Sequence, residues 1–246
     1  MNEQVQVVIL AAGKGMRLGR SVPKPLTPLE DGRTILRQQI DNLRGTLDPE
    51  VPITAVVGFQ ACVVMEAAPD LLFAYNARYD STNTAKSLLL ALTASGPGGV
   101  LWLNGDVVFD PCIIEHVGPW LRADQSFVCV NQASVGEEEI KYTLDRHGWL
   151  KLLSKTVVSG LGEAVGINYV SSADRPVLVE QLRRCADMDY FERGIEKAIE
   201  VKGLRIAPVD ITRFAAVEVD FEDDLRKANR IHRPIGVLGD SATSGV

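Results

Sequence analysis

The stretch Val5-Gln6-Val7-Val8-Ile9-Leu10 is followed directly by Ala11-Ala12-Gly13-Lys14-Gly15-Met16-Arg17. The first part is a short, uncharged, β-branched run, which is typical of a buried parallel strand. The second part predicts a glycine-rich turn, because glycine adopts positive φ and lets a ligand approach the backbone closely. Consecutive amide groups in such a turn form an anion-binding nest. The sequence therefore predicts a phosphate-binding loop behind its first strand.

The alternation of strand and helix continues along most of the chain. The spacing of Ile35, Ile40 and Leu43 predicts a helix over 34–43, before a second strand at 53–58. Further strands are expected at 71–75, 99–103, 127–130, 204–209 and 216–219. Further helices are expected at 83–93, 112–121, 177–185, 191–199 and 221–231. This order predicts an α/β fold, with a mostly parallel sheet and helices on both faces.

The pattern changes in the second half of the chain. Shorter runs predict hairpin-type strands at 142–145, 149–153 and 165–170, with a turn at 146–148. We therefore expect one domain over 1–232 that carries a small β-rich insertion at about 134–161. Residues 233–246 have too little apolar content to pack well and predict a flexible tail.

Composition and charge limit the classes of function. The chain has 246 residues, 46% of them hydrophobic and 24% charged, which suits a globular protein whose core needs no disulfide or structural metal. The net charge is −6 with no long Lys or Arg run, which argues against binding of duplex nucleic acid. The four cysteines and three histidines lack the spacing of a zinc or redox motif. With no apolar run that predicts membrane insertion and no secretory signal, a cytoplasmic location is expected.

The turn itself fits neither of two standard nucleotide-binding motifs. A dinucleotide fingerprint would need a third glycine where this chain has Leu18, which disfavours a dinucleotide-dependent oxidoreductase. The Gly-Lys-Ser/Thr ending of a P-loop is also absent. Arg17 and the segment Pro23-Lys24-Pro25 instead add two cations close to the turn. A glycine turn with solvated side chains is the simpler alternative, but the combination favours binding of a phosphorylated anion.

Gly13, Gly15 and Arg17, followed by Pro23-Lys24, form the pattern Gly-x-Gly-x-Arg and Pro-Lys. This pattern resembles the signature of the nucleotidyltransferase family that joins an NTP to a phosphorylated acceptor. Further stretches resemble the same family, in order, along most of the chain: 76–87, Asn104-Gly105-Asp106, Ser154-Lys155, 162–167, and 217–220 with 223–225. The sequence is most similar to bacterial cytidylyltransferases acting on phosphocholine, aminoethylphosphonate or inositol phosphate. The resemblance implies a Rossmann-like fold and a requirement for Mg²⁺.

The resemblance also implies a role for each matching residue. Catalysis is implied for Arg17 and Lys24, and metal binding for Asp106 and Asp220. Nucleotide binding is implied for Leu10, Ala11, Ala12, Gly13, Gly15, Asn76, Thr82, Asn83, Ser87 and Asp106. Acceptor binding is implied for Lys155, Glu163, Lys141 and Tyr190.

The two aspartates fit a metal site on chemical grounds as well. Asp106 closes the strand 99–103, and ligands of open parallel sheets bind beyond the carboxyl ends of strands. Mg²⁺ usually takes one or two carboxylates and completes its octahedron with phosphate and water. A turn role for Asp106 and an N-cap role for Asp220 are the alternatives. Likewise, Lys155 and Lys141 could be solvated charges, and Glu163 could merely complete a turn.

The expected reaction is transfer of a nucleotidyl group from CTP, or another NTP, to a small phospho- or phosphono-acceptor. A choline head group would need an aromatic cage, to which Tyr142, Tyr169, Tyr190 and Phe191 could contribute. The low aromatic density at 166–170 favours a hydroxylated or aminated acceptor instead. The alternatives are a sugar-1-phosphate nucleotidyltransferase that uses UTP or another NTP, and a non-catalytic nucleotide-sensing homologue. A homodimer is also considered.

Overall fold

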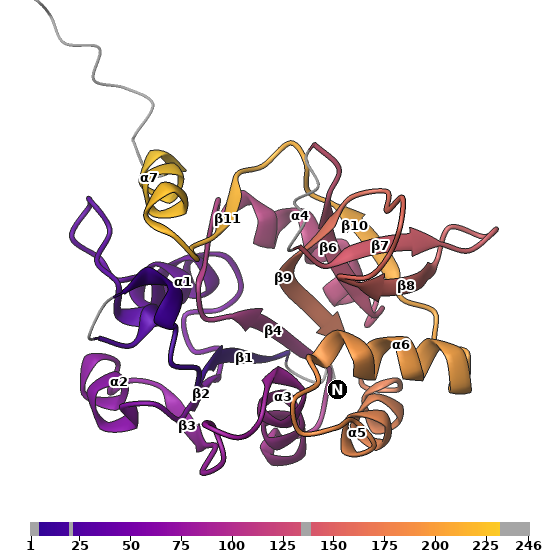
Figure 1. Cartoon of the computed structure of the whole chain (residues 1–246), viewed down its shortest axis with the longest axis horizontal. Coiled ribbons are helices and arrows are strands. Elements are labelled where there is room, and N and C mark those ends of the chain that lie inside the picture. Colours follow the sequence, from indigo (N-terminus) through magenta and orange to yellow (C-terminus); the bar gives the residue numbers. More distant parts are fainter. Residues whose placement is uncertain (1–4, 20–21, 134–138, 232–246) are drawn as a thin grey trace, which may run out of the picture.

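The computed structural model describes residues 5–19, 22–133 and 139–231 (Figure 1). Within these residues a nine-stranded mixed sheet forms the centre of the molecule. Its main path runs in the order β10-β6-β9-β4-β1-β2-β3. In chain order these strands are β1 (Gln6–Ala11), β2 (Ile53–Val57), β3 (Leu72–Tyr75), β4 (Val100–Asn104), β6 (Phe127–Asn131), β9 (Glu163–Val170) and β10 (Ala207–Asp210).

Strand β1 lies at the point where the strand order reverses. The chain passes from β1 to β2 and β3 on one side and then crosses to β4 on the other, with parallel pairing throughout. β9 runs antiparallel to its neighbours β4 and β6, so its first half lies at the carboxyl end of β4. In open α/β sheets ligands bind beyond the carboxyl ends of the strands at such a switch point. The topology therefore directs attention to the ends of β1 and β4.

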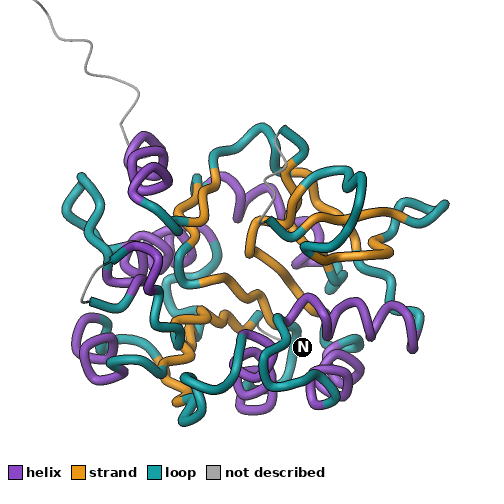
Figure 2. Tube along the Cα trace, viewed as in Figure 1, coloured by secondary structure: helices purple, strands orange, loops and turns teal. Residues whose placement is uncertain are grey.

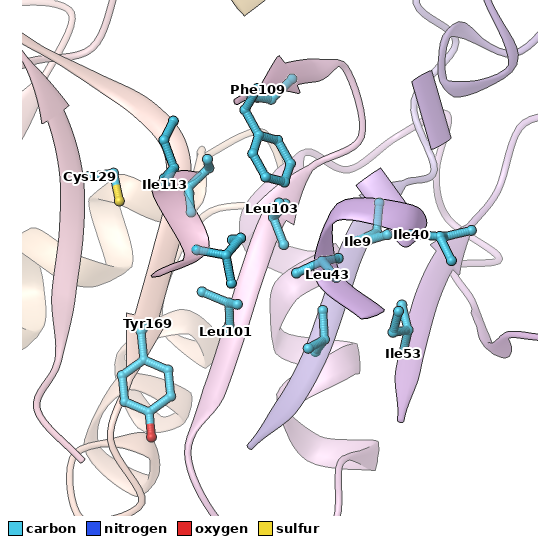
Figure 3. Packing of buried hydrophobic residues seen from close by; sticks show 14 of the residues in the cluster. Ile9, Ile40, Leu43, Ile53, Leu101, Leu103, Phe109, Ile113, Cys129 and Tyr169 are labelled. Atoms are coloured by element: carbon cyan, nitrogen blue, oxygen red, sulfur yellow. The ribbon is translucent and has the colours of Figure 1, made fainter. Parts of the chain in front are cut away.

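Helices cover both faces of this sheet, as expected. One face carries α1 (Ile35–Thr46), α2 (Ala61–Ala67) and α4 (Cys112–Arg122). The other carries α3 (Thr84–Ala94), α5 (Arg175–Arg183) and α6 (Phe191–Lys202). Val7 and Ile9 of β1 belong to the first core, whereas Val8 and Leu10 belong to the second. Figure 3 shows Ile9 with Ile40 and Leu43 of α1 in the first core. Burial on both faces explains why β1 is uncharged.

Two smaller β elements flank the sheet. β11 (Ala216–Glu218) pairs antiparallel with β5 (Val107–Phe109), and α7 (Glu222–Ile231) packs beside them (Figure 1). β7 (Lys141–Leu144) and β8 (Leu150–Ser154) form the hairpin that the sequence predicted (Figure 2). β8 packs against α6, where the Leu153 N–H donates to Glu196 Oε1 at 3.1 Å. Residues 134–138 of the predicted insertion and the predicted tail 233–246 lie outside the described residues. The domain boundaries stay a prediction.

The α/β fold is confirmed, while some short elements were not predicted. These are α2, β5 and the 3-10 turns Met16–Leu18 and Lys24–Leu26. The start of α2 follows Gln60, which has φ 48° and provides no side-chain cap, so the sequence lacks a helix-start signal there. β10 begins at Ala207 rather than 204. Among the described helices, none has both the length and the apolar character needed to cross a membrane.

Candidate active site

A cavity of about 240 Å³ opens at the carboxyl ends of β1 and β4. It brings together ten of the residues predicted from the sequence: Leu10, Ala11, Gly13, Gly15, Arg17, Lys24, Asp106, Lys155, Tyr190 and Asp220. A larger cavity, of about 820 Å³, lies near the amino ends of β1 and β4. It borders Asp124, whose carboxylate accepts hydrogen bonds from Tyr169 and Ser172. We place the candidate site in the smaller cavity, because the switch point and the motif residues meet there.

Lys24 is the centre of the charged cluster in this cavity. Its Nζ donates to Asp106 Oδ2 and to Asp220 Oδ1, each at 2.6 Å. Arg17 Nη1 donates to Asp220 Oδ2 at 2.9 Å. The Lys24 side chain is 8% exposed, whereas that of Arg17 is 50% exposed. One cation is thus fixed in the protein, and the other reaches toward solvent.

The glycine loop and two prolines position Lys24. Pro23 and Pro25 flank it in a 3-10 turn, in which the Leu26 N–H donates to Pro23 O at 2.8 Å. Gly15 has φ +56°, and a Cβ there would lie 2.6 Å from the Cβ of Lys24. Only glycine accommodates both the left-handed backbone and this close approach. The Gly-x-Gly and Pro-Lys segments of the motif therefore pack against each other.

Both aspartates are held by the ends of strands. Asp106 follows β4, and its carbonyl accepts a hydrogen bond from the Val219 N–H at 3.0 Å. This bond brings β11, and Asp220 just after it, against the end of β4. The Asp220 carboxylate accepts hydrogen bonds from Lys24 and Arg17, which makes it a member of a charge cluster.

The donor set at this point fits Mg²⁺. Two carboxylates converge on one cation, and the buried Oδ1 of Asp106 has no hydrogen-bond partner. Hard oxygen ligands of this kind are those that Mg²⁺ takes, usually one or two from the protein. In the part of the chain that the structure describes, no group of three or more His, Cys, Asp or Glu side chains is arranged for a metal. A site here would therefore depend on Asp106, Asp220 and ligand oxygens.

Charge compensation determines the pKa values in this cluster. Burial opposes the charged form of Lys24, but Asp106 and Asp220 outweigh it and raise the pKa of the ammonium above its ordinary value. Burial also opposes ionisation of Asp220, yet Lys24 and Arg17 keep the pKa of its carboxyl below the usual range. Lys24 is therefore a cation and Asp220 an anion at neutral pH.

The cavity also holds acids that the sequence interpretation did not single out. Its lining includes Glu139, Glu192 and Glu218, together with the cation Lys155. The Asn104 Nδ2 donates to Glu218 Oε1 at 3.1 Å. Burial, and then the charges of Asp106 and Glu139, raise the pKa of Glu218 well above its ordinary value. Burial likewise raises the pKa of Glu192 to about 7.

A signal for one of these acids was present in the sequence. In Val217-Glu218-Val219-Asp220 the acids alternate with valines, so Glu218 points to the same side of the strand as Asp220. Gly166, with φ +65°, leaves room for this arrangement, because a Cβ there would lie 2.7 Å from Glu218 Oε1. Glu192 gave no comparable signal, since an acid in the first turn of a helix is ordinary.

The segment 76–87 is organised by its own hydrogen bonds and does not line the cavity, except at Thr84. Asn76 Nδ2 donates to Thr82 Oγ1 and to Ser87 Oγ, each at 3.1 Å. Asn83 caps α3, accepting from the Thr84 N–H at 2.8 Å. Ala12 is buried, and its carbonyl accepts from the Phe59 N–H. Nucleotide binding by these residues stays a prediction.

Two predicted acceptor residues also lie outside the cavity lining. Lys141 and Glu163 face each other across the pairing of β7 with β9. Their acceptor role stays a prediction. The aromatic cage considered for choline is not assembled, because Tyr142 and Tyr169 are buried in the two cores. Tyr190 and Phe191 do border the cavity.

Comparison with known proteins identifies the class of this fold. The inositol-1-phosphate CTP transferase from T. maritima has a TM-score of 0.76 at 14% identity, covering 96% of this chain and 99% of that chain. The CTP:phosphocholine cytidylyltransferase from Streptococcus pneumoniae has a TM-score of 0.72 at 18% identity, covering 94% and 100%. At these identities the likeness shows the fold, which is that of the nucleotidyltransferases.

Sequence comparison then gives the family. The MobA-like NTP transferase domain matches residues 7–188, and the chain belongs to that family. CMP-5'-(3-aminopropyl)phosphonate synthase from Streptomyces rubellomurinus is 30% identical over an alignment of 253 positions, which covers 92% of this chain. The chain spans 38% of that relative's length. The bifunctional protein GlmU from Prochlorococcus marinus is 36% identical over 115 residues, 45% of this chain and 25% of that protein.

Proposed function

We propose that the protein is a magnesium-dependent cytidylyltransferase that joins CTP to a small phosphorylated or phosphonate acceptor. The products are a CDP-linked compound or a CMP-phosphonate, together with pyrophosphate. The observation that carries this proposal is the convergence of Arg17, Lys24, Asp106 and Asp220 at the ends of β1 and β4. CTP is supported by the relative from S. rubellomurinus, whose name specifies a CMP-phosphonate.

The reaction is an in-line displacement at the α-phosphorus of the nucleotide. An anionic oxygen of the acceptor forms the new O–P bond, while the bond between the α-phosphorus and the pyrophosphate oxygen breaks. The acceptor oxygen is already deprotonated at neutral pH, so no general base is required. Catalysis then depends on positioning and on neutralising negative charge.

The cations of the site suit those two tasks. Lys24 is buried and held at two points, so its ammonium is preorganised for the charge that develops on the α-phosphate. Arg17 is half exposed and offers a planar set of donors to the departing pyrophosphate. Asp106 and Asp220 would hold Mg²⁺, which would supply positive charge against the triphosphate oxygens.

Pyrophosphate release tests the proposal. The protein is incubated with Mg²⁺, with CTP, UTP, ATP, GTP or dTTP, and with a panel of phosphate esters, phosphonates and sugar 1-phosphates. We expect turnover with CTP and a non-sugar acceptor, and a product whose mass is that of the acceptor plus CMP. Absence of pyrophosphate with every pair, or wild-type release by Lys24→Ala and Asp106→Ala variants, would overturn the assignment.

A sugar-1-phosphate nucleotidyltransferase is the second candidate. It is favoured by the structural likeness to a glucose-1-phosphate thymidylyltransferase from Bacillus anthracis, which has a TM-score of 0.74 at 17% identity. The same panel distinguishes the two, because turnover confined to sugar 1-phosphates with UTP or dTTP would select this candidate. Binding of an NTP without turnover would instead indicate a nucleotide-sensing homologue.

A further inference from the structure

Glu192 is a buried carboxylate whose charge the protein leaves largely uncompensated. The residue is 7% exposed and lines the candidate site at the start of α6. Its Oε2 is buried without any hydrogen-bond partner. An isolated buried carboxylate is costly unless something pairs with it. A ligand that enters the cavity is in a position to provide that partner.

The charges of the cavity indicate which kind of chemical group this partner is. The described residues that line it include five carboxylates and three cations. Both substrates of the proposed reaction are anions, so an ionised Glu192, whose Oε2 has no hydrogen-bond partner, would repel a ligand that carries negative charge alone. A positive group on the acceptor removes this conflict, because it would compensate the acids at one end while its phosphorus group meets the cations at the other.

Lys155 does not fulfil this role by itself. Its positive charge lowers the pKa of Glu192, yet burial outweighs this effect and raises that pKa to about 7. The Lys155 Nζ lies 5.4 Å from the centre of the Tyr190 ring and makes no hydrogen bond to Glu192 Oε2.

The framework around Glu192 is fixed before any ligand arrives. Thr84 Oγ1 accepts a hydrogen bond from the Phe191 N–H at 3.0 Å, which joins the start of α3 to the start of α6. The Ala85 N–H donates to Asp189 O at 3.2 Å in the same junction. Phe191 packs edge-on against Trp102 of β4, with ring centroids 5.6 Å apart. The carboxylate is therefore presented from a rigid helix start.

We propose that Glu192 binds a primary ammonium group on the acceptor and so selects aminated phosphonates or phosphate monoesters. This inference rests on the proposed function and specifies its acceptor. A primary ammonium has three N–H donors for carboxylate oxygens. A trimethylammonium group has none and needs an aromatic cage. Here Lys155 already lies over the Tyr190 ring, so a cage is not available.

Matched acceptors test the proposal with the wild-type protein. The first pair is 2-aminoethylphosphonate and ethylphosphonate, and the same comparison is made with chains of three and four carbons. 2-Hydroxyethylphosphonate and phosphocholine complete the panel. We expect kcat/KM for an aminated acceptor to exceed that of its alkyl counterpart by about 10- to 100-fold, as for one charge-assisted hydrogen bond. Equal use of aminated, hydroxylated and alkyl acceptors would overturn the proposal.

The substitution Glu192→Gln tests the residue itself. It keeps the shape of the side chain and removes the charge, so kcat/KM should fall by about 10- to 100-fold for the aminated acceptor and stay unchanged for the alkyl one. Glu200→Gln, on the exposed side of the same helix, is the matched control and should leave both values unchanged. Equal losses on both acceptors, or a higher Mg²⁺ requirement with unchanged discrimination, would overturn the proposal.

The two levels of proposal fail in different ways. If no acceptor releases pyrophosphate from any NTP, the proposed function is wrong. If the alkyl acceptor turns over as well as the aminated one, the function stands and the ammonium site is wrong. The wild-type comparison keeps the test decisive even if Glu192→Gln should fail to fold.

Discussion

The surroundings of Lys24, the balanced half of the cavity, and those of Glu192, its other half, treat buried charge in opposite ways. Around Lys24, each acid has a cation as partner, and the pKa of Asp220 is lowered as a result. Around Glu192, burial dominates and the pKa of the carboxyl is raised to about 7. The charges of the first half are balanced within the protein, whereas in the second half the Oε2 of Glu192 is buried without a partner. This difference suggests that one half is preorganised for chemistry and the other for selection of a ligand.

The largest effect is expected from removing the cation of the balanced half. Lys24→Ala should lower kcat by about 1,000-fold, because the charge that develops in the transition state loses its preorganised partner. KM for the nucleotide should change much less, since Arg17 and the glycine loop remain. Steady-state kinetics measure both values. Substitution of the exposed Lys151 by Ala serves as the control. If Lys24→Ala raised KM and left kcat unchanged, Lys24 would be a residue that binds the ground state only.

Metal dependence tests the other members of that half. Chelation by EDTA should abolish pyrophosphate release, and added Mg²⁺ should restore it. Asp106→Asn should raise the Mg²⁺ concentration for half-maximal rate by at least about 10-fold, because a neutral amide replaces a charged ligand. Asp48→Asn, at the opposite end of the sheet, should leave it unchanged. An unaltered Mg²⁺ titration in Asp106→Asn would exclude this aspartate as a ligand.

The burial of Glu192 predicts that the stability of the protein falls as pH rises. The pKa of Glu192 rises from 4.5 to about 7 on folding, so stability falls as pH increases through that window, by about 3 kcal/mol in total. The charges that act on Glu192 are those of Lys155, Glu196 and Glu218. Glu192→Gln should therefore raise Tm by about 5 °C or more at pH 8 and much less at pH 5. If thermal melts show the same difference in Tm between variant and wild type at both pH values, ionisation of the buried Glu192 does not destabilise the protein.

The smallest effect concerns the loop that positions Lys24. Gly15→Ala should cost about 1–3 kcal/mol of stability, because the residue has positive φ and its Cβ would meet Lys24. Gly13→Ala should stay within about 0.5 kcal/mol, because a Cβ there meets nothing within 4 Å. Denaturant unfolding of both variants measures the difference. Equal losses would show that the two glycines share one structural role.

The sequence predicted the elements that periodicity controls. The uncharged run 5–10 and the helical spacing in 34–43 correspond to β1 and α1. The antiparallel place of β9 between β4 and β6 was not predicted, because strand order depends on long-range pairing that local pattern does not encode. The turns around Arg17 and Lys24 were likewise found only as a motif and not as 3-10 structure.

For the site, too, local motifs were predictable from the sequence, whereas features that depend on long-range contacts were not. Arg17, Lys24, Asp106 and Asp220 were found because they belong to short motifs, and they meet in the structure. Asn76, Lys141 and Glu163 do not line the cavity, since their hydrogen bonds and strand pairings occupy them elsewhere. Glu192 acquires its unusual surroundings only through tertiary burial, which a single sequence does not reveal.

The bonds to Asp220 also have a consequence for the order in which the protein is built. Asp220, just after β11, lies 196 positions from Lys24 and 203 positions from Arg17 along the chain. Contacts of such long sequence separation form late, and chains are synthesised from the N-terminus. A growing chain therefore assembles most of its sheet while one carboxylate of the charged cluster is still missing. Activity should appear abruptly at the end of folding, so that its onset serves as a kinetic marker of completed assembly.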